Sequence, residues 1–99
     1  MFLHIVMMQL ANADDAFLAR VRYYEERIRS ELPYVCDYRF GRNIAARAKG
    51  FGWTVIGIFD SSADHDRYQV SALHQEMKAL MSPHIVDIAV CDFDSAGSK

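Results

Sequence analysis

The sequence predicts an α+β fold in which four strands and two helical regions follow one another in the order β-α-β-β-α-β. Four short apolar segments have the length and composition of strands. Two longer segments between them carry apolar residues at the spacing of amphipathic helices. The 99 residues suit one domain, which we expect to span residues 1–94 and to be followed by a polar tail at 95–99.

The first predicted strand covers residues 2–9, "FLHIVMMQ". Its nearly continuous hydrophobicity is typical of a strand that is covered on both faces. Together with Ala11-Asn12-Ala13 the segment also resembles a secretory signal. However, no Lys or Arg precedes the apolar run, and the run is short. We therefore favour a strand, and expect a soluble, cytoplasmic protein without a membrane-spanning segment.

The first predicted helix covers residues 14–32, with Asn12 or Asp14 as the candidate N-cap and Pro33 as the stop. Its apolar residues recur at steps of three and four positions and form one stripe. This stripe consists of Phe17, Val21, Tyr24, Ile28 and Leu32.

The charges of this helix argue against nucleic-acid binding. In "RVRYYEERIR" the arginines alternate with Glu25 and Glu26, which is typical of a solvated helix face. The net charge of the chain is −2, whereas binding to phosphates requires a basic surface. We expect no nucleic-acid partner.

The second and third strands are predicted at residues 34–43 and 53–61. The segment 41–52 between them, "GRNIAARAKGFG", lacks the glycine patterns of phosphate-binding loops, so a hairpin connection is favoured over a phosphate site. The third strand is apolar on both faces, which predicts a central position. Gly57 would leave room there for a close neighbour or a ligand.

The second helical region is predicted at residues 62–81, and the last strand at 84–93 after the terminator Pro83. This order is the ferredoxin-like pattern, a four-stranded antiparallel sheet with helices on one face. Because the strands are apolar on both faces, the second sheet face must be buried by another chain. We therefore predict a homodimer that forms through the sheet face.

Metal and disulfide sites are not indicated by the cysteines or histidines. Cys36 and Cys91 lie in apolar runs and are predicted to be buried thiols without a CxxC pattern. The histidines lack HExxH spacing, so we expect no metal and no cofactor. His65, between two aspartates, is expected to be solvated, and His84 to be structural.

Several short features, in order, resemble the stress-responsive A/B barrel (dabb) family. They are "HIV" in the first strand, "FDS" closing the third, "YQVSALH", and "DF" at the end of the last. The resemblance implies homodimers whose two sheets join into an α+β barrel. One plant member cyclises a linear polyketide with a tyrosine and a histidine spaced like Tyr68 and His74, and a first-strand histidine matches His4. That enzyme has a further pocket histidine where this chain has Trp53.

The stretch "HDRYQVSALHQEM" contains the candidate catalytic pair, Tyr68 and His74. On one continuous helix their side chains would lie roughly 120° apart. A break near Val70 and Ser71, with Ser71 as N-cap, would let them converge. Other family members often have a proline shortly before this histidine, and this chain has none, which weakens the case for a break. A structural role of the pair is therefore favoured over ligand binding and catalysis.

The sequence leaves three functions open. The favoured one is a small organic ligand in a pocket between sheet and helices. An enzyme would be a cyclase, isomerase or lyase acting on a carbonyl compound, with His74 as base and Tyr68 stabilising the oxyanion; by analogy of fold, a cofactor-free monooxygenase is also conceivable. A non-catalytic, stress-related stable protein is the third. The expected pocket residues, besides Tyr68 and His74, are His4, Trp53, Val55 and Phe59.

Overall fold

A computed structural model describes residues 1–95 and confirms the predicted order of elements. The strands are β1 (Phe2–Leu10), β2 (Asp37–Arg42), β3 (Trp53–Phe59) and β4 (Ile85–Asp94). The helices are α1 (Asp15–Glu31), α2 (Ser62–Gln69) and α3 (Ala72–Met81), followed by one 3₁₀ turn, η1 (Ser82–His84). Beyond Ser95, the predicted polar tail lies outside the described residues. No helix within residues 1–95 is long and apolar enough to cross a membrane.

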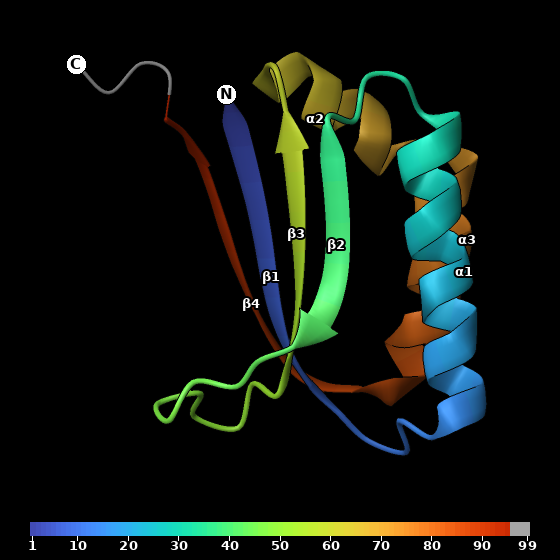
Figure 1. Ribbon diagram of the computed structural model, residues 1–99, viewed down its shortest axis with the longest axis vertical. Helices are drawn as coiled ribbons and strands as arrows, with labels where there is room; N and C mark the ends of the chain where they lie inside the picture. The colour runs from blue at the N-terminus through green and yellow to red at the C-terminus, as the bar shows by residue number, and fades with distance from the viewer. Residues whose placement is uncertain (96–99) are drawn as a thin grey trace.

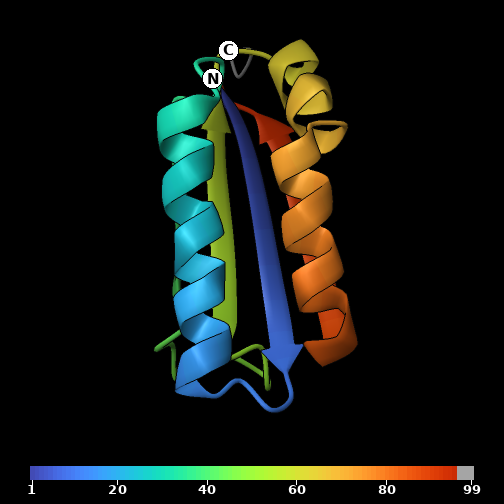
Figure 2. The same cartoon turned by 90° about the vertical axis from the view of Figure 1, so that its right-hand side faces the viewer.

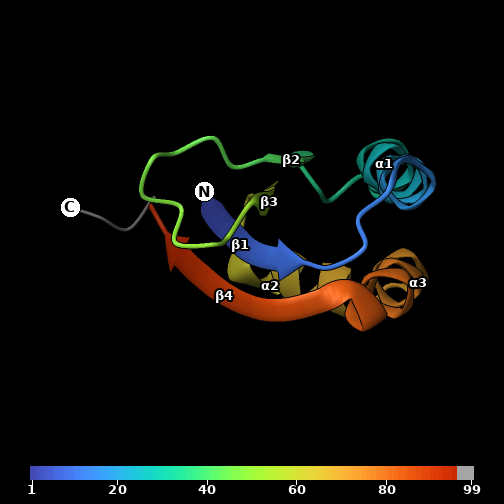
Figure 3. The ribbon, with the colours of Figure 1, turned by 90° about the horizontal axis from the view of Figure 1, so that it is seen from below.

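The four strands form one antiparallel sheet in the order β2-β3-β1-β4 (Figure 1). All helices lie on the same face of this sheet, and its other face is bare, as the view along the strands makes clear (Figure 3). Helices α1 and α3 run side by side across the covered face (Figure 2). The architecture is the predicted ferredoxin-like α+β fold.

The strand register decides which side chains meet the helices. His4 on β1 is paired with Gly57 on β3 and with Asp92 on β4, and side chains of such direct partners share one face. This face is covered by the helices. The alternate residues point to the bare face, and they are mostly apolar: Leu3, Ile5, Met7, Ile56, Ile58, Ala89, Cys91 and Phe93.

The apolar stripe of α1 forms part of the core, as predicted. Val21 and Ile28 are fully buried against the sheet, and Phe17 is nearly so. The helix begins at Asp14, whose carboxylate accepts a hydrogen bond from the backbone N–H of Phe17 at 2.9 Å. Burial of each such side chain contributes about 1.5–3 kcal/mol to folding.

Glu25 does not lie on a solvated face, contrary to the prediction. It is only 8% exposed, and its carboxylate accepts a hydrogen bond from the backbone N–H of Phe40 at 2.8 Å. The guanidinium groups of Arg22 and Arg29 lie 3.5 and 3.3 Å from the same carboxylate. Because β2 is an edge strand, this N–H has no partner strand, and Glu25 satisfies it.

The segment between β2 and β3 is a hairpin connection, as predicted. Its two ends are joined by a hydrogen bond from the N–H of Asn43 to the carbonyl oxygen of Gly52 at 2.8 Å. Lys49 and Gly50 both adopt the left-handed conformation, with φ of 57° and 86°, and turn the chain back.

The prediction of buried thiols is wrong for both cysteines, which are exposed and unpaired. Cys91 belongs to the bare face of the sheet, opposite Ile5. Cys36 precedes β2, and its thiol lies 3.4 Å from Asp60 Oδ1. Apolar neighbours in sequence therefore do not imply burial here. Cys91 is exposed because its sheet face has no cover within the chain, and Cys36 because it lies at the end of the sheet, before β2.

Candidate functional site

The second helical region is broken where the sequence allowed a break. Helix α2 ends at Gln69, and Ser71 is the N-cap of α3. The Ser71 hydroxyl accepts from the N–H of His74 at 3.2 Å and donates to the carbonyl oxygen of Tyr68 at 2.7 Å. One serine thus satisfies a terminal group of each helix, which stabilises the break without a proline.

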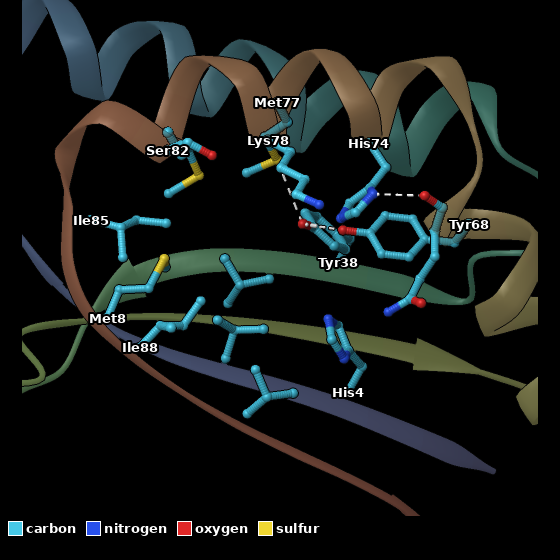
Figure 4. Close-up of a pocket in the computed structure, with 15 residues that line it drawn as sticks. His4, Met8, Tyr38, Tyr68, His74, Met77, Lys78, Ser82, Ile85 and Ile88 are labelled. Carbon is cyan, nitrogen blue, oxygen red and sulfur yellow. Dashed lines mark hydrogen bonds between the residues drawn. The ribbon is translucent and has the colours of Figure 1, made fainter.

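The break brings Tyr68 and His74 together (Figure 4). Their ring centroids are 4.5 Å apart, with an angle of 55° between the ring planes. On a continuous helix these residues would point about 120° apart. The two side chains therefore converge, as expected for a helix that breaks near Val70 and Ser71.

His74 is held in one tautomer by the backbone. Its Nδ1 lies 2.9 Å from the carbonyl oxygen of Gln69, and a carbonyl can only accept, so Nδ1 carries the hydrogen. Burial lowers the pKa of His74 below 6.5, with nearby His4 and Lys78 acting in the same direction. The ring is therefore neutral at pH 7, and Nε2, which faces the cavity in Figure 4, offers a lone pair.

Tyr68 shares a hydrogen bond with a second buried tyrosine. Its hydroxyl lies 2.7 Å from the hydroxyl of Tyr38, which lies 3.5 Å from Met77 Sδ. Burial raises the pKa of Tyr38 to about 12 and also raises the pKa of Tyr68, so both remain protonated. When Tyr38 donates to Met77, Tyr68 donates to Tyr38; when Tyr38 donates to Tyr68, the hydrogen of Tyr68 is available to a ligand.

Gly57 gives space to the ring of Phe59 beside the tyrosine pair. A Cβ at this position would lie 2.9 Å from Phe59 Cε1 and 3.5 Å from Tyr38 Cδ1. The absent side chain thus gives space to two aromatic rings, and the room predicted at Gly57 is filled by close neighbours. Phe59 packs in turn against Tyr68, with ring centroids 5.4 Å apart.

A cavity of about 410 Å³ lies between the sheet and α3 (Figure 4). Of the predicted pocket residues, His4, Val55, Tyr68 and His74 line it. Polar groups from Tyr68, His74 and Lys78 lie together toward one end in Figure 4. Most of the remaining lining is aliphatic or thioether: Val6, Met8, Met77, Met81, Ile85, Ile88 and Val90.

Two predicted pocket residues lie elsewhere. Trp53 is stacked on Phe40, with centroids 5.3 Å apart and the rings 2° from parallel, and the Arg42 guanidinium lies 4.6 Å above its ring. Phe59 is fully buried beneath Tyr68. Within the described residues, neither lines the cavity. Both residues share the sheet face of Val55, but the cavity occupies only the part of that face under α3.

Most of the lining was not singled out by the sequence, including three residues with polar groups close to the Tyr68–His74 pair. Tyr38 lies opposite Gly57 in the register of β2 and β3, and this position beside the predicted room at Gly57 is the signal that could have identified it. Lys78 is one helical turn after His74 and was detectable by that spacing. Gln69 contributes through its carbonyl oxygen, which only the helix break exposes.

His4 and His65 form a second polar group beside the cavity. His4 Nδ1 lies 2.5 Å from Asp92 Oδ1, and the ring of His4 lies 4.4 Å from that of His65. The expected solvation of His65 is wrong, since its side chain is 5% exposed and stacked on Phe2. His65 and Tyr68 are three residues apart and share the inner face of α2. Burial lowers the pKa of His65.

The fold and cavity define a ferredoxin-like α+β domain whose open side carries an apolar sheet face. Residues 2–95 match the Stress responsive A/B Barrel Domain, Dabb, and the chain belongs to this family. The resemblance inferred from the sequence is thus confirmed. No curated protein matches the chain.

Several solved structures share this fold. A Dabb family protein from Mesorhizobium loti is 18% identical, with a TM-score of 0.78 and coverage of 97% of each chain. A dimeric ferredoxin-like protein of unknown function from Jannaschia sp. is 19% identical, with a TM-score of 0.82, and the match covers 94% of this chain and 97% of that one. A hydroxynitrile lyase from Passiflora edulis is 18% identical, with a TM-score of 0.80 and coverage of 93% and 90%. At these identities the likeness concerns the fold alone.

Proposed function

We propose that the cavity binds a small, largely apolar organic molecule that carries a carbonyl group. The single observation that supports this most is the division of the lining into an apolar part and a polar end. The apolar part would bury the carbon skeleton, and the hydroxyl of Tyr68 would donate to the carbonyl oxygen. The volume of about 410 Å³ suits a ligand of this size.

Ligand binding is tested with a panel of alkyl ketones and acyl phenols, detected by saturation-transfer NMR and calorimetry. The blocking variant is Val90→Trp, because Val90 lines the cavity yet is 56% exposed, so a larger side chain can enter without disturbing the core. Val86→Trp is the matched control on the same strand, outside the lining. Binding that Val90→Trp abolishes and Val86→Trp preserves supports the proposal. Binding that is absent, or equal in both variants, contradicts it.

A second candidate function is proton transfer at a carbon next to the carbonyl. The neutral His74 ring, with Nδ1 held by Gln69 and Nε2 directed to the cavity, favours it. Nε2 would take a proton from the α-carbon, while Tyr68 would stabilise the developing oxyanion. The lyase among the similar structures indicates that carbonyl chemistry is compatible with this fold, although the chemistry of this chain must be tested on its own residues.

Proton transfer is testable without the natural substrate. A ketone that binds should exchange its α-hydrogens for deuterium in D2O, which NMR records as loss of the α-proton signal. We expect His74→Gln to abolish the exchange while binding remains. If the wild-type protein binds the ketone but leaves its α-hydrogens in place, the cavity is a binding site only.

We also propose that two copies associate through the bare sheet face. An exposed apolar face of this extent is typical of interfaces, and similar proteins of this fold are dimeric. Light scattering should give twice 11.3 kDa. Ile5→Asp, in the middle of that face, should yield a monomer, whereas Val70→Asp, on the helical side, should not. A monomeric wild-type protein would refute the dimer.

A stress-related protein without a ligand remains the third candidate. Its mark would be unusual heat resistance, with a Tm above about 90 °C. A Tm in the ordinary range would argue against this function.

A further inference from the structure

We propose that His4, His65 and Asp92 form a binding site for a divalent transition-metal ion of the zinc type. The three residues come from β1, α2 and β4, and one possible ligand atom of each lies within 4.8 Å of the other two. The site includes neither Tyr68 nor His74, although His4 also lines the cavity. Its existence does not depend on whether the cavity binds an organic molecule.

The backbone positions these three side chains. His4 and Asp92 are direct partners in the register of β1 and β4, so their side chains rise from the same sheet face. Helix α2 lies over this end of the sheet and brings His65 down onto them, with the two imidazole rings 4.4 Å apart. Both histidines are buried, 6% and 5% exposed, while Asp92 is partly open to solvent. The three residues are therefore enclosed by protein at the two histidines and accessible to solvent at Asp92.

The chemistry of the ligand set selects the kind of ion. Two imidazole nitrogens and one carboxylate oxygen are a common set for zinc and for iron(II), cobalt(II) or nickel(II). Magnesium and calcium prefer sites made of oxygen atoms alone. Three protein ligands leave a position for water.

Small side-chain movements would bring the ligand atoms to coordination distance. Metal–nitrogen bonds of about 2.0–2.1 Å place neighbouring ligand atoms roughly 3 Å apart. His4 Nδ1 and Asp92 Oδ1 are already 2.5 Å apart, and must separate slightly. His65 must approach, and coordination through its Nε2 would replace the contact of that atom with the Gln69 amide nitrogen at 3.2 Å. Gln69 is exposed and free to move away.

The site is tested with tag-free protein freed of metal by a chelator. Zinc chloride is titrated by calorimetry, and cobalt(II) is followed by its visible absorption. The variants are Asp92→Asn, which keeps the hydrogen bond to His4, and His65→Phe, which keeps the stack on Phe2. His84→Phe is the control, because it removes another histidine and keeps a ring against Phe17, whose centroid is 3.9 Å from that of His84.

The expected result is one ion per chain, with affinity at least about tenfold lower in Asp92→Asn and His65→Phe and unchanged in His84→Phe. NMR of the wild-type ring nitrogens gives an independent readout if a variant misfolds. Zinc should shift the signals of His4 and His65 and leave that of His84 in place. The absence of zinc binding, equal binding in all variants, or shifts that spare His4 and His65 would overturn the proposal.

Discussion

The carbonyl oxygen of Gln69, 2.9 Å from Nδ1 of His74, fixes which nitrogen of that ring carries its hydrogen. This carbonyl is available because α2 ends at Gln69 and its usual acceptor role in a helix is lost. The same break that lets Tyr68 and His74 converge therefore also sets the tautomer of His74. The break between α2 and α3 is therefore the common cause of the side-chain arrangement and of the tautomer of His74.

Ser71→Ala should weaken both the helix break and the site. The variant loses the N-cap of α3 and the bond from Ser71 to the Tyr68 carbonyl, which should reduce the free energy of unfolding by about 1 kcal/mol. Ser61→Ala is the matched control, since Ser61 caps α2 in the same way. Both variants should lose similar stability in urea titrations. Only Ser71→Ala should also weaken binding of a ketone that binds the wild-type protein, and equal binding would argue against the role of the break.

Gly57→Ala should be more destabilising than Gly41→Ala. The new Cβ at position 57 would lie 2.9 Å from a ring atom of Phe59, which is fully buried and cannot move freely. Overpacking of this kind costs about 1–3 kcal/mol. A Cβ at Gly41, on the neighbouring strand, meets no atom within 4 Å. Urea titration gives the free energy of unfolding of both variants. Equal values would mean that the core around Gly57 rearranges to accept the new Cβ.

Tyr68→Phe should destabilise the protein by about 1 kcal/mol, because it removes the hydroxyl that bonds with Tyr38 inside the protein. Tyr23→Phe is the control. Tyr23 is 56% exposed and its hydroxyl accepts from Arg27 at the surface, so the change should stay within about 0.5 kcal/mol. A Tyr68→Phe variant as stable as the wild type would indicate that the hydroxyl pair contributes no net stability.

Stability should fall as the pH falls below about 6.5. The folded protein holds the pKa of His74 and that of His65 below 6.5, so the unfolded chain binds protons more tightly. Their contribution is complete above about pH 6.5 and is lost as the pH falls through the lower, folded values. Urea midpoints measured at about pH 7.5 and 5.5 should therefore differ less in His74→Gln than in the wild type. Identical pH dependence would contradict the burial of a neutral ring.

Much of the fold could be predicted from the sequence because, in each element, the spacing of the apolar residues agrees with the residues that begin or end the element. The stripe of α1, the stop at Pro33 and the alternating faces of β3 all direct the chain to one topology. Glu25 and Cys91 were misplaced because their burial is decided by parts of the chain far from them in sequence. Burial depends on which neighbour covers a position, and here an edge strand needs a hydrogen-bond acceptor while one sheet face lacks a cover.

The candidate site was only partly predictable. The sequence could suggest that Tyr68 and His74 converge because serine is a favoured N-cap residue. Ser71 lies between them and is the N-cap of α3 in the structure. Asp92 and His65 carry no local signal, since their relation to His4 arises from strand register and helix packing across the whole chain.

The most direct test of the proposed site is an NMR titration of the His74 ring nitrogens from about pH 5 to 8, the range in which imidazoles ordinarily change charge. His74→Gln assigns the signal. The structure predicts a neutral ring protonated at Nδ1, with a pKa below 6.5, and a shift of the Nε2 signal when a ketone binds. A ring protonated at Nε2, or a pKa at or above 6.5, would contradict the arrangement on which the proposed chemistry depends.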